Sequence, residues 1–353
     1  MSSPFGTLGL SVCCALGLTA CLLPSYEAID AEPETTVTAA CGDLSTLSTS
    51  CGNCIASQCC SEASTCSGDA DCADHMAALI TPLQSIHQDF EPLLQCMSTL
   101  CEQACNVTWG CLDRYSFSAP ADTYDRTVLL SDFANESPVD DVSVRACQGV
   151  SPDCSSGLQA EAISTNGVTT LANLAPNFQG YFSFSGGSRD QEPYVDATVQ
   201  WSEPVYRHAD FTHFMLRESD LRSLAQLTGY HSTADEPFAA DRGHLIVRVQ
   251  GCLPFGYLNN PNTPRAEAAN VVISASPNDG ASRFYYTDLR TGGMIDTNLD
   301  ATTKDGVAGA FELPAGLVTV VARRSDNGAE VARAGVRVEA GKLSYVYLLP
   351  RGR

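Results

Sequence analysis

The spacing of the cysteines constrains this chain more than any other sequence feature. Eleven of its 17 cysteines fall between Cys41 and Cys111, in a chain of 353 residues. So short a segment holds little apolar core, and in exported proteins such segments are usually stapled by disulfides. The pair Cys51-x-x-Cys54 also fits half a zinc ribbon or a redox site, and both alternatives stay open. We predict a disulfide-rich helical module over 41–115, with a pairing that the spacing leaves undetermined.

The N-terminal residues read as an export signal. Residues 5–20 contain no charged side chain, and this run is shorter than the roughly 20 residues that a transmembrane helix needs. It ends in Leu18-Thr19-Ala20-Cys21, which resembles the lipobox of bacterial lipoproteins. The resemblance implies a signal peptide over 1–20 and a diacylglycerol group joined to the Cys21 thiol, so that the membrane becomes a partner through a lipid anchor. An ordinary cleaved signal and an uncleaved anchor are the alternatives.

The anchor sets an expected location and an expected number of paired cysteines. In the lipoprotein family an Asp after the lipidated Cys retains many members at the inner membrane, so Leu22 implies the outer membrane of the cell envelope, on its periplasmic or its surface side. Residues 21–40, the lipidated Cys and a flexible tether, are rich in Pro, Glu, Thr and Ala. Without Cys13, Cys14 and Cys21, an even number of cysteines remains to form disulfides. These are Cys41, Cys51, Cys54, Cys59, Cys60, Cys66, Cys72, Cys96, Cys101, Cys105, Cys111, Cys147, Cys154 and Cys252.

Beyond the cysteine block the sequence is rich in β-branched residues. Alternating segments bounded by Gly, Pro, Asn and Asp predict strands over 142–146, 181–184, 244–249, 271–275, 317–321, 336–338 and 343–349. The predicted fold class is mainly β, with two tandem small β-sandwiches after the signal peptide, the tether and the helical module. The first covers 120–205 and the second 244–353. A helical connector lies between them over 206–243, with Ser219 as the cap of a short helix and Gly229 at its stop.

The two β regions contain an internal repeat. The second copy reads Thr303-Lys304-Asp305-Gly306, then a strand ending in Phe311, then Leu313-Pro314-Ala315-Gly316; the first copy has Ser164-Thr165-Asn166-Gly167. This order resembles carboxypeptidase regulatory-like domains, which implies prealbumin-like sandwiches without catalytic residues. The expected core of the second sandwich consists of its alternating apolar residues. These are Leu245, Val247, Val249, Val271, Ile273, Phe311, Leu313, Val318, Val320, Val336, Val338, Val346 and Leu348.

Charge and motifs exclude several function classes. The formal net charge is −21, with 20 basic residues and no Lys/Arg cluster, so nucleic-acid binding is excluded. The chain contains no Gly-x-Ser-x-Gly elbow, no P-loop and no Gly-x-Gly-x-x-Gly fingerprint. The aromatic residues Trp201, Tyr181-Phe182 and Tyr285-Tyr286 are expected in the core, with a sugar-stacking platform as the alternative.

One segment carries oxygen ligands at alternating positions. Asp296, Asn298 and Asp300, with Asp305 following, could wrap a Ca²⁺ ion. The sixth and twelfth positions of an EF-hand would be Ala301 and Val307, so that motif is not present. The histidines follow no metal-binding pattern and are expected to be structural. The prediction is therefore no cofactor, with Ca²⁺ at this segment as the alternative.

These observations predict a non-catalytic lipoprotein of the bacterial cell envelope. It would act as a surface binding, adhesion or spacer module, with a glycan or an envelope protein as its partner. The alternative is an envelope hydrolase, or an accessory subunit of an envelope enzyme complex, with its site between the β domains.

Overall fold

The structure, a computed structural model, describes most of residues 41–351. It leaves out 43, 45–46, 69–71, 73–89, 106–107, 110–111, 114–121, 150–153, 156, 177, 203–210, 232, 234, 252–267, 289–293, 297 and 304. The predicted signal peptide, Cys21 and the tether over 21–40 lie outside the described residues. Among the residues that are described, no helix is both long and apolar enough to cross a membrane.

The helical module is built from short helices around a core of cysteines. Its helices are α1 (Thr49–Gln58), α2 (Cys60–Ser67), α4 (Phe90–Leu100) and α5 (Glu102–Cys105). Ser48 caps α1, because its Oγ accepts a hydrogen bond of 3.3 Å from the Cys51 amide. Ile55, Leu93 and Met97 belong to a small core whose other buried members are mostly cysteines.

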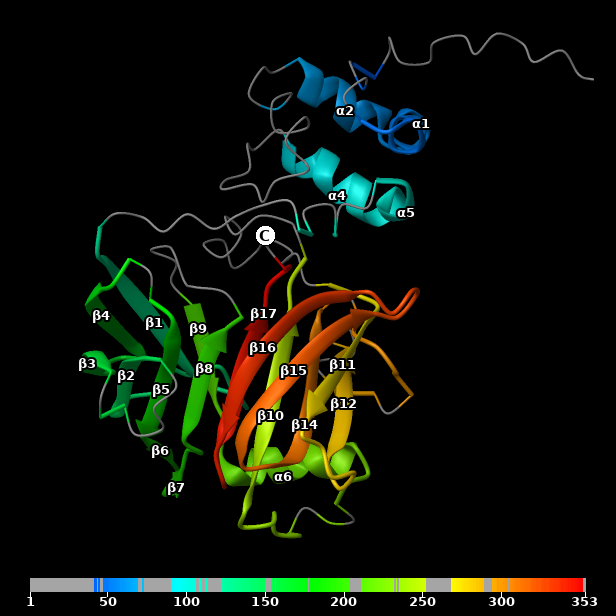
Figure 1. Ribbon diagram of the computed structural model, residues 1–353. Coiled ribbons are helices and arrows are strands. Elements are labelled where there is room, and N and C mark those ends of the chain that lie inside the picture. The colour runs from blue at the N-terminus through cyan, green and yellow to red at the C-terminus, as the bar shows by residue number, and fades with distance from the viewer. Residues whose placement is uncertain are drawn as a thin grey trace, which may run out of the picture. The chain divides into compact units, whose positions relative to one another are not determined.

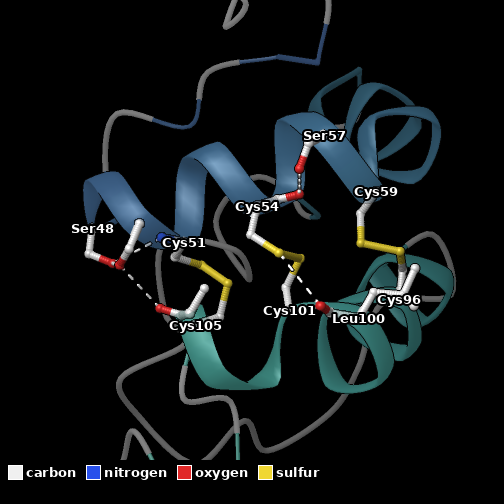
Figure 2. The surroundings of a disulfide bond; sticks show 11 residues. Ser48, Cys51, Cys54, Ser57, Cys59, Cys96, Leu100, Cys101 and Cys105 are labelled. Carbon is white, nitrogen blue, oxygen red and sulfur yellow. Dashed lines mark hydrogen bonds between the residues drawn. A yellow bond between two sulfur atoms is a disulfide. The ribbon is translucent and has the colours of Figure 1, made fainter. Parts of the chain in front are cut away.

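Three disulfides tie α1 and its C-terminal end to α4 and α5. They join Cys51 to Cys105, Cys54 to Cys101 and Cys59 to Cys96, and they lie side by side like rungs (Figure 2). Two further bonds, Cys41–Cys60 and Cys66–Cys72, join α2 to the residues before α1 and to those after α2. The predicted disulfide-rich helical module is confirmed. Cys51 and Cys54 bond to separate partners, so they form neither a zinc site nor a redox pair.

Among the described residues of the β region, seventeen strands form four sheets. Figure 1 shows how these strands are arranged. The first half contains β1 (Tyr124–Asp132), β2 (Val142–Gln148), β3 (Leu158–Ile163), β4 (Val168–Leu174), β5 (Gly180–Gly186), β6 (Ser188–Arg189), β7 (Glu192–Pro193), β8 (Ala197–Trp201) and β9 (Phe211–Met215). The second half contains β10 (Arg242–Val249), β11 (Val271–Ser276), β12 (Arg283–Asp288), β13 (Met294–Ile295), β14 (Val307–Pro314), β15 (Gly316–Arg324), β16 (Glu330–Val338) and β17 (Leu343–Leu348). The mainly β fold is confirmed.

One long sheet runs through both sandwiches. Its order is β13-β12-β14-β10-β17-β8-β5-β2-β3, and β17 pairs in parallel with β8 at the junction. The sheet β4-β1-β9 packs on the β8-β5-β2 half and the sheet β11-β15-β16 on the β14-β10-β17 half, each through its own buried apolar cluster. The two sandwiches are therefore one hydrogen-bonded body, whereas the sequence predicted two separate modules.

The segment between the sandwiches differs from the expected helical connector. It supplies β9, which pairs in parallel with β1 and so extends the first sandwich past residue 205. It also contains helix α6 (Glu218–Leu227), whose N-cap is Arg217 rather than Ser219; the Arg217 amide donates to the Asp220 carboxylate. Buried Leu221 places α6 in the same cluster as residues of β12 and β14, so α6 covers one face of the long sheet.

A bulge in β14 separates its two predicted core residues, Phe311 and Leu313, into different clusters. Ala308, Ala310 and Leu313 belong to the outer core beneath β11-β15-β16, whereas Phe311 belongs to the cluster shared with α6 and the first sandwich. Glu312 adopts a positive φ of 53°, and the β10–β14 register shifts there. An extra residue in a strand turns the following side chains to the opposite face, so Leu313 returns to the side of Ala308 and Ala310. Phe311 lies on the other side, as ordinary alternation from Ala310 requires. All the other predicted core residues of the second sandwich lie in the outer core.

The strand pairing reproduces the internal repeat. In the first copy β1 pairs antiparallel with β4 and parallel with β9, and in the second copy β10 pairs in the same way with β14 and β17. Likewise β5 lies between β2 and β8, and β15 lies between β11 and β16. The long sheet thus joins one sheet of the second copy to the opposite sheet of the first.

Hydrogen bonds fix the equivalence of individual residues. The Leu130 amide donates to the Gly167 carbonyl at 2.7 Å, and the Val249 amide donates to Gly306 at 2.8 Å. Asn166 and Gly167 have φ of 52° and 69°, as a tight hairpin turn requires.

A buried hydroxyl supports the next turn of each copy. The Val142 amide donates to Ser164 Oγ, and the Val271 amide donates to Thr302 Oγ1, each at 3.0 Å. Ser164 thus corresponds to Thr302, one residue before the Thr303 that begins the motif read from the sequence.

Candidate functional site

A polar hollow of about 510 Å³ opens among the loops of the first sandwich. The β1–β2 loop, the β5–β6 turn and the residue after β7 form its walls. Its lining contains two carboxylates, one guanidinium group and several hydroxyls. The lining residues are Ser137, Pro138, Val139, Asp140, Asp141, Gly187, Ser188, Arg189 and Tyr194.

A buried carboxylate holds one wall of the hollow in place. Asp132, the last residue of β1, is fully buried and accepts hydrogen bonds from Arg189 Nη1 at 2.7 Å and from the Tyr194 hydroxyl at 2.8 Å. It also accepts from the amides of Ala134 and Asn135, which close the turn that follows. Buried Asp132 therefore holds the side chains of Arg189 and Tyr194 in place, while part of the Arg189 side chain stays exposed.

The same hydrogen bonds set the pKa values of this cluster. Burial by itself would raise the pKa of Asp132, but the bonds from Tyr194, Ala134, Arg189 and Asn135 hold it below the ordinary value. Burial, with the negative Asp132 next to it, raises the pKa of the Tyr194 hydroxyl. Around neutral pH the cluster is thus an ionised Asp132 with a protonated Tyr194 and a charged Arg189.

Backbone geometry brings the opposite wall close. Asp140 Oδ1 accepts a hydrogen bond of 3.0 Å from the Gly167 amide, which fixes this side chain at the rim. Gly187 has φ of 68°, and a Cβ there would lie 2.9 Å from Val142 Cγ2 and 3.0 Å from the Asp140 carbonyl oxygen. A larger residue at 187 would push the β5–β6 turn away from the β1–β2 loop and change the hollow.

Sequence analysis did not identify these residues. Asp132 ends an alternating strand of apolar residues, and Gly186-Gly187 marks a loop, but neither pattern indicates a site. The signal that could have been used is a carboxylate at a position where alternation predicts a buried side chain. The partner residues come from 57 and 62 positions further along the chain, which local patterns do not reveal.

A second titratable cluster fastens the segment after α6 to the second sandwich. Glu312 accepts hydrogen bonds from the Tyr230 hydroxyl and the Ala239 amide. Phe238 packs against both His231 and His244, with ring centroids 4.6 and 4.2 Å apart. Burial lowers the pKa of His244 to about 4. The cluster is packed and satisfied at Glu312, so its evident role is to hold this segment on the sheet.

His213 is buried at the junction of the sandwiches. Its ring stacks on Phe184 at 4.2 Å and meets the Tyr345 ring at 4.7 Å. Burial lowers its pKa to about 3, so the side chain is neutral around pH 7. His213, His231 and His244 are all core residues, while His208 lies outside the described part of the chain.

The predicted calcium ligands serve as turn residues. Asp296 Oδ1 accepts hydrogen bonds from the backbone amide and the side-chain amide of Asn298, both at 2.9 Å. Asp305 lies beside Thr303, whose Oγ1 is 3.3 Å from its Oδ2, and Asp300 is exposed. Within the described ranges, no three His, Cys, Asp or Glu side chains form a group that could hold a metal ion.

The remaining predicted disulfide cysteines divide into two groups. Cys147 pairs with Cys154 across the end of β2, so neither of them links the first sandwich to the helical module. Cys111 and Cys252 lie outside the described residues.

The candidate sugar platform is core instead. Trp201 stacks on Tyr347 at 5.0 Å with an interplanar angle of 8°, and the Arg126 guanidinium lies 5.1 Å from the Trp201 ring centroid. Phe182 is fully buried and Tyr285 is 7% exposed. These rings hold the sandwiches together and form no exposed row.

Known proteins show only a partial likeness to this chain. No family model matches it, and no curated protein matches it. Solved structures with partial likeness include the TIE protein of Bacillus anthracis (13% identity over 65% of this chain and 34% of that chain, TM-score 0.18). Others are a double mutant of the shaft pilin SpaA of Lactobacillus rhamnosus GG (11% identity, 65% and 99%, TM-score 0.19) and a streptococcal ancillary pilin (14% identity, 67% and 65%, TM-score 0.20). The match spans about a third of the TIE protein, and likeness at these TM-scores identifies no function.

Proposed function

We propose that this chain is a non-catalytic, lipid-anchored protein of the bacterial cell envelope that holds a rigid binding and spacing module away from the membrane. The observation that carries the proposal is the parallel pairing of β8 with β17, from Ala197–Leu343 to Trp201–Tyr347. Hydrogen bonds across this junction merge the two sandwiches into one sheet. A merged sheet with a filled core resists bending between its halves, as a spacer requires.

The disulfides support a location outside the cytosol. Six bonds join described cysteines, and such density is typical of exported proteins in oxidising compartments. The lipobox-like segment Leu18–Cys21 supports the further proposal that this exported protein carries a lipid anchor. Acyl chains on Cys21 would give stable attachment without a spanning helix.

The alternative function is a hydrolase, or an accessory subunit, with a site between the β domains. That junction is occupied by packed side chains, including Trp201 on Tyr347 and His213 between Phe184 and Tyr345. This packing supports the non-catalytic proposal. A hydrolytic turnover that disappears in His213→Gln or His244→Gln, with the fold retained, would favour the hydrolase instead.

Fractionation of cells tests the anchor. Wild-type protein is expected in the membrane fraction and in the detergent phase. Cys21→Ser is expected in the soluble fraction or as the unprocessed precursor, because serine provides no thiol at the lipobox position on which the thioether could form. Cys14→Ser, which changes a cysteine inside the signal segment, is the matched control and should behave like wild type. Unchanged detergent partitioning of Cys21→Ser would reject the lipid anchor.

A further inference from the structure

We propose that the polar hollow of the first sandwich is the binding site of a hydroxyl-rich carbohydrate that is neutral or carries an amino group. This inference rests on the proposed function as a binding module and names its ligand class. A volume of about 510 Å³ lies within the range of small-molecule sites, roughly 300–1,000 Å³. The loops that form the hollow join rigid strands, which is where sandwiches usually carry recognition.

The hollow is built around a group that is costly to bury. Asp132 is fully buried and ionised. Removing a carboxylate from water costs several kcal/mol, which its hydrogen-bond and ion-pair partners must offset. A buried ion pair adds little net stability compared with apolar side chains of similar size. What this pair does provide is position, because it holds Arg189 and Tyr194 at the wall of the hollow.

The internal repeat shows that the fold does not need the carboxylate of Asp140. Asp140 lies two residues before Val142, and the equivalent position before Val271 is Ala269. The second copy makes the same hairpin and the same hydroxyl-supported turn without a carboxylate there. Asp140 is exposed as well, so burial does not explain its presence.

The lining chemistry selects the ligand. Asp140 and Asp141 are exposed carboxylates that accept hydrogen bonds from hydroxyl or ammonium groups, and such charge-assisted bonds are about twice as strong as neutral ones. Arg189 donates to ring and hydroxyl oxygens, while its charge is balanced by Asp132. The lining therefore carries an excess of negative charge, which repels uronic acids, phosphates and other anions. A sugar supplies hydroxyl donors and oxygen acceptors for these groups without adding negative charge.

The first experiment applies the detergent-solubilised full chain to an array of neutral, amino and acidic bacterial oligosaccharides. We expect retention on neutral or amino sugars and none on acidic ones. The best neutral or amino probe is then titrated calorimetrically. Asp140→Asn and Asp141→Asn should each weaken its binding by about tenfold or more, equivalent to about 1.4 kcal/mol. Asp235→Asn, the same charge change at an exposed residue outside the hollow, should leave the affinity unchanged.

A second measurement places the ligand. Carbodiimide labelling of exposed carboxylates, mapped by mass spectrometry, should be reduced at Asp140 and Asp141 by the bound probe and unchanged at Asp235. Absence of binding across the array, wild-type affinity in both hollow variants, or unprotected Asp140 and Asp141 would each overturn this site. Those outcomes leave membrane retention through Cys21 intact, so failure of the site and failure of the proposed function are distinguishable.

Discussion

The two sandwiches share one pattern of strand pairing, but equivalent strands differ in how many of their faces are buried. In the first copy, β1 alternates between buried Val128 and Leu130 and an exposed Leu129, so one of its faces meets solvent. The equivalent β10 is covered on both sides. Val247 faces the outer core, and Ile246 packs against the cluster that α6 completes. The two strands therefore pair in the same way, although β1 has one buried face and β10 has two. The difference arises because other segments of the chain cover the second face of β10.

The shared cluster predicts that the two copies unfold together. Phe311→Ala should lower the free energy of unfolding by about 3–5 kcal/mol through the cavity that it leaves. The chain has two tryptophans: Trp109 packs in the outer core, and Trp201 packs against the shared cluster. Urea titrations of Trp109→Phe and Trp201→Phe backgrounds, each followed by the remaining tryptophan, should show the same shift.

Surface and cooperativity controls sharpen this test. Leu317→Ala, at a residue that is 61% exposed on β15, should change stability by less than about 0.5 kcal/mol. If Phe311→Ala moves the Trp201 transition and leaves the Trp109 transition in place, the second sandwich is an independent module and the merged description is wrong.

Acid should weaken the shared region next. The pKa values of His213 and His244 are about 3 and about 4, below the ordinary 6.5, because burial disfavours their charged forms. The unfolded chain therefore binds more protons below pH 6.5, so stability falls as pH falls. Between about pH 6.5 and 5 each histidine should cost about 2 kcal/mol.

Urea midpoints measured across this range check the size of the effect. Asp132 does not contribute there, because its folded pKa is lowered and the stability it provides is lost only below the ordinary aspartate value. His213→Phe, which keeps a ring on Phe184, should remove about half of the pH dependence. A pH dependence that His213→Phe leaves unchanged would mean that His213 is not the buried neutral group described above.

The disulfide at the end of β2 belongs to the first copy. Cys147 and Cys154 close a loop with a sequence separation of 7, so the double change Cys147→Ser, Cys154→Ser should cost about 2–3 kcal/mol. The Trp201 transition in urea measures this. If the double variant and the wild type have the same free energy of unfolding before reduction, and reduction lowers it equally in both, the bond does not stabilise the fold.

The smallest effect tests the repeat itself. Ser164→Ala and Thr302→Val each remove a buried hydroxyl that supports the Val142 or the Val271 amide. Each should cost about 1–3 kcal/mol, because a buried backbone amide loses its partner. Chemical denaturation of both variants should give costs that agree to within about 0.5 kcal/mol. A large cost at one position and none at the other would show that the two turns are not equivalent.

The sequence predicts those structural features that are set by residues close together in the chain. Alternation of apolar residues located seven strands, and Asn166-Gly167 located a tight turn, because strand and turn preferences act within a few residues. The density of cysteines predicted the helical module for the same reason. The helix cap was placed at Ser219 instead of Arg217, since capping by Arg217 and Asp220 follows no common pattern.

Tertiary structure decided the features that need distant partners. Which cysteines pair depends on how helices meet, so that Cys51 and Cys54 take separate partners 54 and 47 residues away. The bulge at Glu312 placed Phe311 and Leu313 on opposite faces of β14, although alternation predicted both in one core. The pairing of β8 with β17, and the approach of Arg189 and Tyr194 to Asp132, likewise join segments that no local pattern connects. By itself the sequence therefore determined the mainly β class, the helical module and seven of the strands, because these follow from short-range preferences. The merged sheet, the shared core and the polar hollow arose only from contacts between residues far apart in the chain.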